Sequence, residues 1–385
     1  MPKVLLKDVV ARIKDKVDKD STNLEYYIGG EHFDYAEVCI TKRGVIQGST
    51  IGPAFHMHFM PGDVLLMSRN PHLRKAGVVD FEGICSDVSY VCRTKDESVL
   101  MQRYLPFVFQ TDHFWEFAER NKKGSTNFFL NWSDFEKYEF DLPGIEEQRK
   151  VTELLWAAQD TKMAYQELLR QSDELVKSQF IEMFGDPIDN PFSWETVGLT
   201  TLGDCKNGMN FGARETGVNI RCIGVGDVKD LAVIDDLSNL TQLSLNEHPS
   251  KEYLLEDGDI VFVRSNGNKN LVGRCVAVYP KQTPLTFSGF CIRFRKKSDA
   301  VLVSYLLHLL KQQSVRAKLV GRGANIQNLN QKMLAALDIL VPPIGLQNDF
   351  ESFVEQLDKS KFELKQSIAN ITALMKSLMQ QDFSN

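Results

Sequence analysis

The sequence predicts an α+β protein in which two similar β-rich domains are each followed by a long helix. Three observations support this fold class. The chain has 385 residues, more than a single hydrophobic core usually serves. A proline turn of the same kind occurs at Pro143 and at Pro342, 199 residues apart. A heptad stripe of apolar residues follows each turn, which indicates two long helices.

The proline turns are repeated joints between a strand and a helix. The first reads DLPGIEEQ and ends at Gln148, and the second reads LVPPIGLQ and ends at Gln347. A shift of 199 residues without gaps also superposes Leu130-Asn131 on Leu329-Asn330 and Lys177-Ser178 on Lys376-Ser377. Because proline cannot continue a strand and suits the first helical turn, each joint sets a helix start.

The stretch after each joint lacks proline and glycine for most of its length and repeats every seven residues. The stripe residues alternate at spacings of four and three, which is the seam of a coiled coil. Each helix is expected to have about 35 residues and a length of roughly 50 Å. The stripes are Val151, Leu155, Ala158, Lys162, Tyr165, Leu169, Ser172 and Val176, and Phe350, Val354, Leu357, Lys361, Leu364, Ile368, Ile371 and Met375.

Lys162 and Lys361 interrupt the two stripes at the same place. A polar residue in a seam can fix the register of the helices at some cost in stability. The alternative is that both lysines lie on the flank and extend their amines to solvent. The stripes themselves have a simpler alternative as the core-facing sides of globular helices, but their length and duplication favour the coiled coil.

The joints divide the chain into four segments. Residues 1–143 are predicted to form the first domain and 144–185 the central helix. Residues 186–342 form the second domain and 343–385 the C-terminal helix. The central helix is expected to stop at FGDP, where Gly185 can cap it and Pro187 prevents its continuation.

Composition excludes several classes of protein. No apolar run approaches the 18 or so residues of a membrane span, and the charged N-terminus lacks the apolar core of a signal peptide. We therefore expect a cytoplasmic protein. The seven cysteines are scattered and form no CxxC pair, which indicates buried thiols in a reducing compartment and no zinc site.

Charge is distributed unevenly along the chain. The net charge is −6, but the stretch from Ile260 to Leu337 has thirteen lysines and arginines and one acid, Asp299. That stretch carries about +12, so the remainder carries about −18. Such asymmetry favours a polyanion such as nucleic acid as partner of the basic part. The alternative is a basic face that pairs with an acidic protein.

Each domain has a strand that leads into a polar loop. PGDVLLMSRN (61–70) continues into PHLRKAG, and DGDIVFVRSN (257–266) continues into GNKNLVG. Arginine binds guanine edges, asparagine binds adenine edges, and loop amides bind phosphate. The alternative is a plain surface hairpin with turn-forming asparagine and glycine. The candidate DNA contacts are Arg69, Asn70, His72, Arg74 and Lys75, and Arg264, Ser265, Asn266, Asn268, Lys269, Asn270 and Arg274.

A second pair of loops has the same order of residue types. RNKKGSTNFFLN (120–131) and VGRGANIQNLN (320–330) each have a basic residue, a glycine, small polar residues and Leu-Asn. Gly124 and Gly323 would permit a close approach of the backbone. Candidate contacts with phosphate or bases are Lys122, Lys123, Arg322 and Asn325.

Catalytic motifs are missing from the sequence. It has no GxxxxGK[ST] phosphate loop, and GVGD at 224–227 is too short for a dinucleotide fingerprint. HMH at 56–58 offers two histidines without a third ligand at a clear spacing, so no metal site is predicted. NPH (70–72) and DNPF (189–192) lack the second proline of the Asn-Pro-Pro-aromatic motif of amino-methyltransferases. These absences favour recognition over catalysis.

At this point the chain resembles the specificity subunit of a type I restriction–modification system, over nearly its whole length. The most specific part of the resemblance is the pair of joints, GSTNFFLNWSDFEKYEFDLPGIEEQ and GANIQNLNQKMLAALDILVPPIGLQ, with MFGDP after the first helix. GDIVFVRSNG also resembles the strand and loop of a target recognition domain. The sequence departs from the family at Gly144, where a second proline is common, and at Gly345-Leu346, where the first joint has two glutamates.

The resemblance implies two pseudo-symmetric target recognition domains, each reading one half of a split DNA site. It implies that two antiparallel helices hold them apart and set the gap between half-sites. The chain itself would be non-catalytic and without a cofactor. Two modification subunits would bind S-adenosylmethionine and methylate adenine, and restriction subunits would use ATP and Mg²⁺ for translocation and cleavage.

Two other functions remain as alternatives. One is a fused methyltransferase, which cofactor binding by the isolated chain would reveal. The other is a scaffold whose long helices join two proteins without reading DNA, which would bind every duplex equally or none. The recognised bases do not follow from the sequence.

Overall fold

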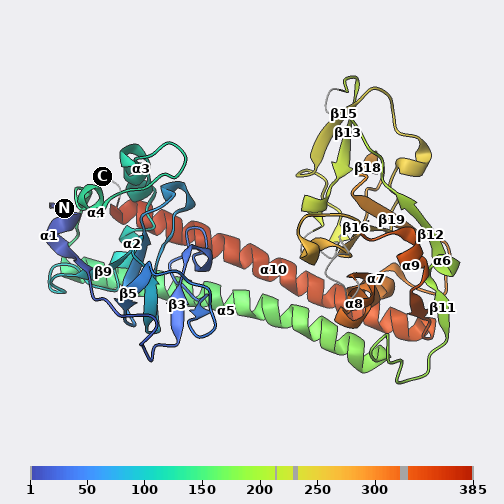
Figure 1. Cartoon of the computed structure of the whole chain (residues 1–385), viewed down its shortest axis with the longest axis horizontal. Coiled ribbons are helices and arrows are strands. Elements are labelled where there is room, and N and C mark those ends of the chain that lie inside the picture. Colours follow the sequence, from blue (N-terminus) through green and yellow to red (C-terminus); the bar gives the residue numbers. More distant parts are fainter. Residues whose placement is uncertain (1, 213–214, 229–232, 321–327, 384–385) are drawn as a thin grey trace. The chain divides into compact units, whose positions relative to one another are not determined.

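The computed structural model describes residues 2–212, 215–228, 233–320 and 328–383 (Figure 1). The chain divides into two compact units. Unit 1 comprises Met1–Glu167 and Leu364–Asn385, and unit 2 comprises Leu168–Glu363. Each unit therefore contains one β-rich segment together with a part of both long helices.

Unit 1 is built on two four-stranded sheets and a short strand pair. Strand β1 (Lys3–Leu5) pairs with β10 (Glu139–Asp141) in antiparallel register. The first sheet has the order β2 (Val10–Ile13), β9 (Ser89–Thr94), β6 (Val64–Met67), β7 (Ala76–Val78). The second has the order β4 (Gly44–Val45), β3 (Tyr26–Ile28), β8 (Gly83–Ser86), β5 (Phe55–Phe59). The short helices are α1 (Leu6–Val9), α2 (Leu105–Val108), α3 (Asp112–Asn121) and α4 (Trp132–Phe135), with 3₁₀ turns η1 (Gly30–His32) and η2 (Pro71–Leu73).

Unit 2 has a five-stranded and a three-stranded sheet. Strand β11 (Thr196–Gly198) pairs with β20 (Asp338–Leu340). The larger sheet has the order β12 (Gly203–Asn207), β19 (Cys291–Lys296), β16 (Asp259–Val263), β17 (Cys275–Val278), β14 (Val233–Ile234). The smaller has the order β15 (Thr241–Leu245), β13 (Val218–Ile223), β18 (Leu285–Phe287). The short helices are α6 (Leu199–Leu202), α7 (Val303–Lys311), α8 (Gln313–Val320) and α9 (Gln331–Ala335), with 3₁₀ turns η3 (Val225–Asp227), η4 (Lys251–Tyr253) and η5 (Lys269–Leu271).

The two units share a scheme of strand pairing. The order β2-β9-β6-β7 in unit 1 corresponds to β12-β19-β16-β17 in unit 2, with antiparallel partners throughout. The parallel pair of β3 with β8 corresponds to that of β13 with β18. The similarity of the two β-rich segments, predicted from PGDVLLMSRN and DGDIVFVRSN, therefore extends to the sheets around them.

The two long helices predicted after the joints are present. Helix α5 (Ile145–Phe184) and helix α10 (Ile344–Phe383) have 40 residues each, which corresponds to about 60 Å. They exceed the expected 35 residues because the helical turns continue beyond the ends of the apolar stripes. Helix α5 ends as predicted at Gly185, which has a φ of 77° and donates its N–H to the carbonyl of Ile181 at 2.8 Å.

The predicted stripe is the less exposed face of each helix. Every stripe residue of α5 and of α10 is buried or half-buried. In unit 1, Val151 and Leu155 of α5 share a core with Met375 of α10. In unit 2, Val176 of α5 shares a core with Phe350 of α10. Each stripe therefore packs into the core of one unit near one end of its helix and into the core of the other unit near the other end. A coiled coil between the two cores stays a prediction.

A buried glutamine explains why the joint is repeated. Gln148 accepts a hydrogen bond from the Met101 N–H at 3.0 Å and donates to the carbonyls of Val99 and Pro143 at 2.8 and 2.9 Å. Gln347 repeats this set of contacts in unit 2. It accepts from the Leu302 N–H at 2.8 Å and donates to the carbonyls of Ala300 and Pro342 at 2.9 and 2.8 Å. Each glutamine ties the first turn of a long helix to the segment that precedes the short helices of its unit.

The two lysines that interrupt the stripes have different partners. Lys162 is buried, and its amine lies 2.7 Å from both carboxylate oxygens of Glu37 in the β-rich part of unit 1. Lys361 is half-buried and pairs with Asp173 of α5 at 2.8 Å. Neither alternative from the sequence fits both residues: Lys162 faces a loop of its unit, and Lys361 joins the two helices.

In the part of the chain that the structure describes, no helix is both long and apolar enough to span a bilayer.

Candidate nucleic-acid interface

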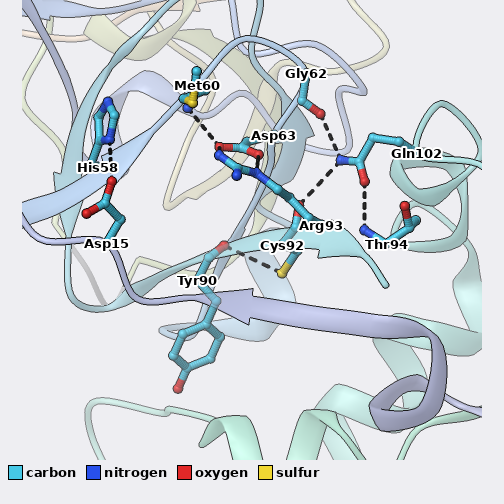
Figure 2. A network of polar contacts seen from close by, with 10 residues as sticks. All are labelled: Asp15, His58, Met60, Gly62, Asp63, Tyr90, Cys92, Arg93, Thr94 and Gln102. Carbon is cyan, nitrogen blue, oxygen red and sulfur yellow. Dashed lines mark hydrogen bonds and ion pairs between the residues drawn. The ribbon is translucent and has the colours of Figure 1, made fainter. Parts of the chain in front are cut away.

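The strand that leads into each candidate loop begins at a buried aspartate. Asp63, just before β6, accepts a hydrogen bond from the Met60 N–H at 2.7 Å. The guanidinium of Arg93 on β9 binds both carboxylate oxygens, with Nη2 at 2.8 Å from Oδ2 (Figure 2). Figure 2 also shows Gln102 bonded to the Gly62 carbonyl and the Thr94 N–H beside this pair. The pair anchors β6 to its neighbour, and its carboxylate raises the pKa of Arg93.

Unit 2 has the same anchor. Asp259 at the start of β16 accepts from the Glu256 N–H at 2.7 Å, and Arg295 on β19 binds its oxygens at 2.8 and 2.7 Å. Such a two-point arginine–carboxylate contact fixes direction as well as distance. Both strands are therefore fixed at their first residues, and each presents the loop that follows it.

The two candidate loops of unit 1 lie side by side. The Asn70 N–H donates to the Phe128 carbonyl at 2.9 Å, and the Leu130 N–H donates to the Ser68 carbonyl at 2.9 Å. Arg69 and Phe129 form an antiparallel bridge between these bonds. Loop 68–75 and loop 122–131, which the sequence presents as separate candidates, therefore form one surface.

Unit 2 brings its loops together at the equivalent place. The Leu329 N–H donates to the Arg264 carbonyl at 2.7 Å, and Ser265 forms an antiparallel bridge with Asn328. Arg322 and Asn325, the candidates of the second loop, lie outside the described residues, as does Gly323. The loops after β6 and β16 are therefore held by the same kind of backbone pairing, as far as the described residues extend.

Three candidates of unit 1 are open to a ligand. Arg69 and His72 are exposed, and neither side chain forms a hydrogen bond or ion pair with another residue that the structure describes. Asn70 is half-buried and adopts the left-handed conformation with a φ of 52°, which asparagine tolerates better than most residues. The buried Pro71 follows it and begins the turn η2, which supports this shape.

The other two candidates of this loop bind other parts of unit 1. Arg74 pairs with Asp112 at the start of α3. Lys75 donates to the Gly30 carbonyl at 2.5 Å. Arg74, followed by Lys376, holds the pKa of Asp112 below its usual range. These two basic residues position the loop.

Both lysines of the second loop also have partners. Lys122 bonds to Glu119 at 2.6 Å and lies over the Phe128 ring, 4.2 Å from its centroid. Lys123 bonds to Asp134 at 2.7 Å and lowers the pKa of that carboxyl group. Their charges are balanced locally, so a phosphate would have to displace a carboxylate to reach them.

Several asparagines of unit 2 shape the loop. Asn266 Oδ1 accepts from the Asn268 N–H at 2.7 Å, and Asn268 Oδ1 accepts from the Asn270 N–H at 3.0 Å. These contacts are the turn-forming role that was the alternative to base recognition. The amide groups of Asn268 and Asn270 remain exposed for contacts with a ligand.

The remaining candidates of unit 2 lie around this turn. Arg264 is half-buried and donates from Nη1 to the Gly289 carbonyl at 3.3 Å. Ser265 is held through its backbone, and Lys269 begins the turn η5. Arg274 is half-buried and donates from Nε to the Asn270 carbonyl at 3.1 Å.

Two exposed aromatic side chains beside the loops were not selected from the sequence. The Phe290 side chain is 61% exposed, and its carbonyl accepts from the Arg264 N–H at 2.8 Å. Phe129 is 39% exposed and pairs with Arg69. Apolar side chains at such places contact thymine methyl groups or enter between base steps. The available signal was an aromatic residue inside a stretch of Gly, Ser and Asn.

The histidines of the HMH motif do not form a ligand cluster. His58 lies between Asp15 and Glu82, with its ring nitrogens 2.7 and 2.9 Å from their oxygens (Figure 2 shows Asp15). Burial opposes the charged ring, but the two carboxylates outweigh it and raise the pKa of His58. Among the described residues, no group of three or more His, Cys, Asp or Glu side chains is placed to hold a metal ion.

Comparison with known proteins finds relatives of the chain in sequence and in fold. Residues 193–373 match the model of the type I restriction modification DNA specificity domain. The chain is 24% identical over 329 residues to the type I restriction enzyme StySPI specificity subunit of Salmonella potsdam, which covers 78% of this chain and 68% of that relative. It is also 24% identical to the EcoKI specificity subunit of Escherichia coli K12, which covers 69% of this chain and 62% of that relative.

Two solved structures have a similar fold. One is a chain from a type I restriction–modification system studied for complex assembly and conformational transition, with a TM-score of 0.56, 17% identity and coverage of 99% of this chain and 97% of that one. The other is the specificity subunit from M. genitalium, with a TM-score of 0.54, 14% identity and coverage of 100% and 96%.

The sequence relatives and the matched domain name the same kind of protein, and the solved structures show the same mixed fold of helices and sheets. The chain is therefore similar, in a large part of its sequence, to the specificity subunits of type I restriction–modification systems.

Proposed function

We propose that this chain is the non-catalytic DNA-recognition subunit of a type I restriction–modification complex, and that each unit reads one half of a split site. The observation that carries this proposal is the pair of converging loops in each unit, held by Asp63–Arg93 in one and Asp259–Arg295 in the other. A strand that presents polar side chains from an anchored loop suits the reading of base edges in a groove.

The long helices would set the gap between the half-sites. Each has 40 residues, and each enters the core of both units. We propose that they pack antiparallel as a coiled coil and make the chain pseudo-symmetric. Two equivalent surfaces on one chain would then dock two modification subunits, as symmetry-related surfaces do in dimeric DNA-binding proteins.

The chemistry would lie on the partner subunits. We propose that the modification subunits bind S-adenosylmethionine and methylate a flipped adenine, and that restriction subunits use ATP and Mg²⁺. Base readout by the chain would supply roughly 1–3 kcal/mol for each two-point contact. Basic residues between Ile260 and Leu337 would add contacts with phosphate and a steep dependence on salt.

The first test is a methylation map of DNA from cells that express this chain with its neighbouring modification subunit. We expect a split, adenine-methylated motif with a fixed gap. Replacement of segment 1–143 by that of a related chain should change one half of the motif and leave the other half unchanged. A change in both halves would refute the modular reading.

A second test measures the gap. Deletion of seven residues from both helices, 163–169 and 362–368, removes the same heptad from each copy of the repeat. One heptad is about 10 Å of helix, so the gap should shorten by about three base pairs. An unchanged gap in an assembled complex would contradict the role of the helices as a spacer.

The two alternatives have separate outcomes. A fused methyltransferase would bind S-adenosylmethionine without partners. A scaffold would give no methylated motif although the complex is assembled, and the loops would then be ordinary hairpins.

A further inference from the structure

Phe290 is an exposed aromatic residue at the place where the candidate loop of unit 2 begins. It is 61% exposed and lies in the turn between β18 and β19. Its carbonyl accepts from the Arg264 N–H at 2.8 Å and from the Ser265 N–H at 3.3 Å. Single exposed apolar residues are common on protein surfaces and need no function. The surroundings of Phe290 therefore decide whether it has one.

The turn that carries Phe290 is held from three sides. The Ser288 N–H donates to the carbonyl of Ile223, the last residue of β13, at 2.9 Å. The Gly289 N–H donates to the Met209 carbonyl at 2.7 Å. The two bonds from the start of the candidate loop hold the third side. Three segments that are distant in sequence thus fix the backbone of residues 288–290.

Two glycines allow residues 208–210 to pack directly on this turn. A Cβ atom on Gly208 would lie 2.0 Å from the backbone oxygen of Ser288, so no other residue fits there without a shift of the backbone. Gly289 is equally close to the side chain of Asn210, where a Cβ atom would lie 2.0 Å from Oδ1. The ring of Phe290 therefore extends from a closely packed backbone.

Unit 1 has the same turn without the ring. The Ser68 N–H donates to the Val88 carbonyl at 2.8 Å, as the Arg264 N–H does to the Phe290 carbonyl. Val88 and Phe290 each directly precede the strand, β9 or β19, that pairs with β6 or β16. Val88 is half-buried. The position at the start of the loop is therefore shared by the two units, and of the two residues only Phe290 is an exposed ring.

The neighbours of Phe290 favour a nucleic acid over a protein as its partner. The Arg264 guanidinium donates to the carbonyl of the preceding residue at 3.3 Å, and Asn210 is exposed beside the turn. The centre of a protein interface is depleted of charged residues and rich in apolar ones, which does not describe this surface. Residues 260–337, which include Phe290, have thirteen lysines and arginines and one acid, and this charge suits a polyanion.

We propose that Phe290 is a wedge that inserts its ring into one base step of the half-site read by unit 2. The inference rests on the proposed function. Apolar side chains that enter a base step unstack it in part and kink the duplex. A wedge needs a fixed backbone, because a mobile turn would move away from the stacked bases. The three-sided hold of residues 288–290 meets this requirement.

A wedge adds specificity for the shape of the DNA without a hydrogen bond to a base. Pyrimidine–purine steps such as TA and CA are kinked easily, whereas A-tracts are stiff. We therefore place the wedge at a pyrimidine–purine step. The half-site read by unit 1 has no such requirement at this position, because Val88 is there. The two half-sites of one chain would then differ in deformation as well as in base sequence.

The test uses the full chain assembled with its modification subunits and duplexes that carry its methylated motif. The unit 2 half-site is the half that is retained when segment 1–143 is exchanged. 2-Aminopurine replaces, one at a time, each purine of that half-site other than the methylated adenine, because its fluorescence rises when a base is unstacked. Binding should raise the fluorescence at one step.

Phe290→Ala should abolish this rise and weaken binding about tenfold or more, because the contact between ring and bases is lost. Phe290→Leu keeps a smaller wedge and should retain part of both effects. Exchange of the opened step for an A-tract step should weaken binding of the wild type and change that of Phe290→Ala little.

Two variants serve as controls. Phe362→Ala removes a ring that is also 61% exposed but lies on α10. It should leave the fluorescence unchanged and the affinity within about twofold. Val88→Ala alters the equivalent position of unit 1 and should leave the fluorescence in the unit 2 half-site unchanged.

Three results would overturn the wedge. The first is no rise at any purine of this half-site, or an equal rise with Phe290→Ala. The second is a loss of affinity when deoxyuridine replaces thymine, without unstacking, which would assign Phe290 to a thymine methyl group. The third is failure of Phe290→Ala to assemble with the modification subunits, which would make the ring a protein contact. In each case the motif methylated by the wild type, and so the proposed function, stands; absence of that motif would reject both.

Discussion

Unit 1 and unit 2 are built on the same scheme of strands, yet the same positions are occupied differently. Gln148 and Gln347 make matching hydrogen bonds, so the joint is reproduced closely. Lys162 and Lys361 occupy the same place in the repeat and bind different partners. The repeat therefore retains its contacts at the joint between strand and helix, while the partners of the stripe lysines diverge.

The sheets beside the recognition loops also differ. In unit 1, β5 pairs with β8 and includes His58. In unit 2, no described strand pairs with β18 at the place that β5 occupies beside β8. Strand β15, which pairs with β13, has five residues, whereas β4, which pairs with β3, has two. If each unit reads its own half-site, divergence in these flanking strands and in the loops is what different half-sites require.

The largest expected effect tests the shared joint. Gln148→Ala and Gln347→Ala should each lower the free energy of unfolding by about 2–4 kcal/mol, because each removes the side-chain partner of three backbone groups, of which the carbonyl of Pro143 or Pro342 is buried. Denaturant unfolding measures both. Gln166→Ala, at an exposed position of α5, is the control and should have little effect. A large loss in one unit and none in the other would break the equivalence of the joints.

The second prediction concerns recognition by unit 1. Arg69→Ala should weaken binding to the cognate duplex by about 1–3 kcal/mol and relax specificity in one half-site only, because Arg69 is exposed and unpaired within the described structure. Lys123→Ala is the comparison, since Lys123 is bonded to Asp134. Competition binding with duplexes altered in one half-site provides the measurement. Relaxed specificity in both halves would argue against separate readers.

The third prediction separates the units by pH. Burial, followed by the charges of Lys311 and Lys361, lowers the pKa of His308 to about 3. In the unfolded chain His308 takes up a proton below a pH of about 6.5, whereas in the folded chain it stays neutral down to a pH of about 3. The free energy of unfolding therefore falls as the pH drops below about 6.5. His308→Phe should remove an acid penalty of about 2 kcal/mol at pH 5. It copies Phe107, which lies six residues after Met101 as His308 lies six residues after Leu302, the two residues whose N–H groups bond to Gln148 and Gln347. Unfolding measured at pH 5 and pH 8 checks this.

His58 in unit 1 should show the opposite sign. Because its folded pKa is raised, its ion pairs are fully present below the unfolded pKa and are lost as pH rises through the folded one. The stability difference between the wild type and His58→Gln should therefore be wider at pH 5.5 than at pH 8.5. A difference that is independent of pH would mean that the ion pairs with Asp15 and Glu82 contribute nothing.

The smallest expected effect concerns the two lysines in the stripes. Lys162→Met should destabilise unit 1 by about 1–2 kcal/mol, because it leaves Glu37 partly buried and unpaired. Lys361→Met should change stability by less than about 0.5 kcal/mol, since Asp173 is largely exposed. The double variant Glu37→Gln/Lys162→Met should recover part of the loss. Equal losses at both lysines would show that they play the same role.

The local parts of the fold followed from the sequence. The heptad stripes, the proline turns and the Gly185 cap predicted α5 and α10, because helix periodicity and helix ends depend on neighbours within one or two turns. The same holds for β6 and β16, each a short apolar run after a Gly-Asp turn. The family resemblance rests on these local patterns as well, which is why it could be recognised from the joints.

The candidate site was only partly predictable. Residue types placed Arg69 and His72 in a loop, but they did not show that Arg74 is bonded to Asp112 while those two are open. The turn-forming contacts of Asn266 and Asn268 depend on the backbone path, and the exposure of Phe290 depends on which strand lies beside β16. Each of these facts arises from neighbours that are distant in sequence or from a specific backbone conformation.

The sequence by itself thus determined the repeat, the two long helices and the resemblance to a family, since all three depend on short-range patterns. Only the tertiary structure decided which loops converge and that Lys162 reaches Glu37 across 125 positions of the chain. The physical reason is that burial and ion pairing depend on distances in space, and chain folding sets those distances between segments that share no local pattern.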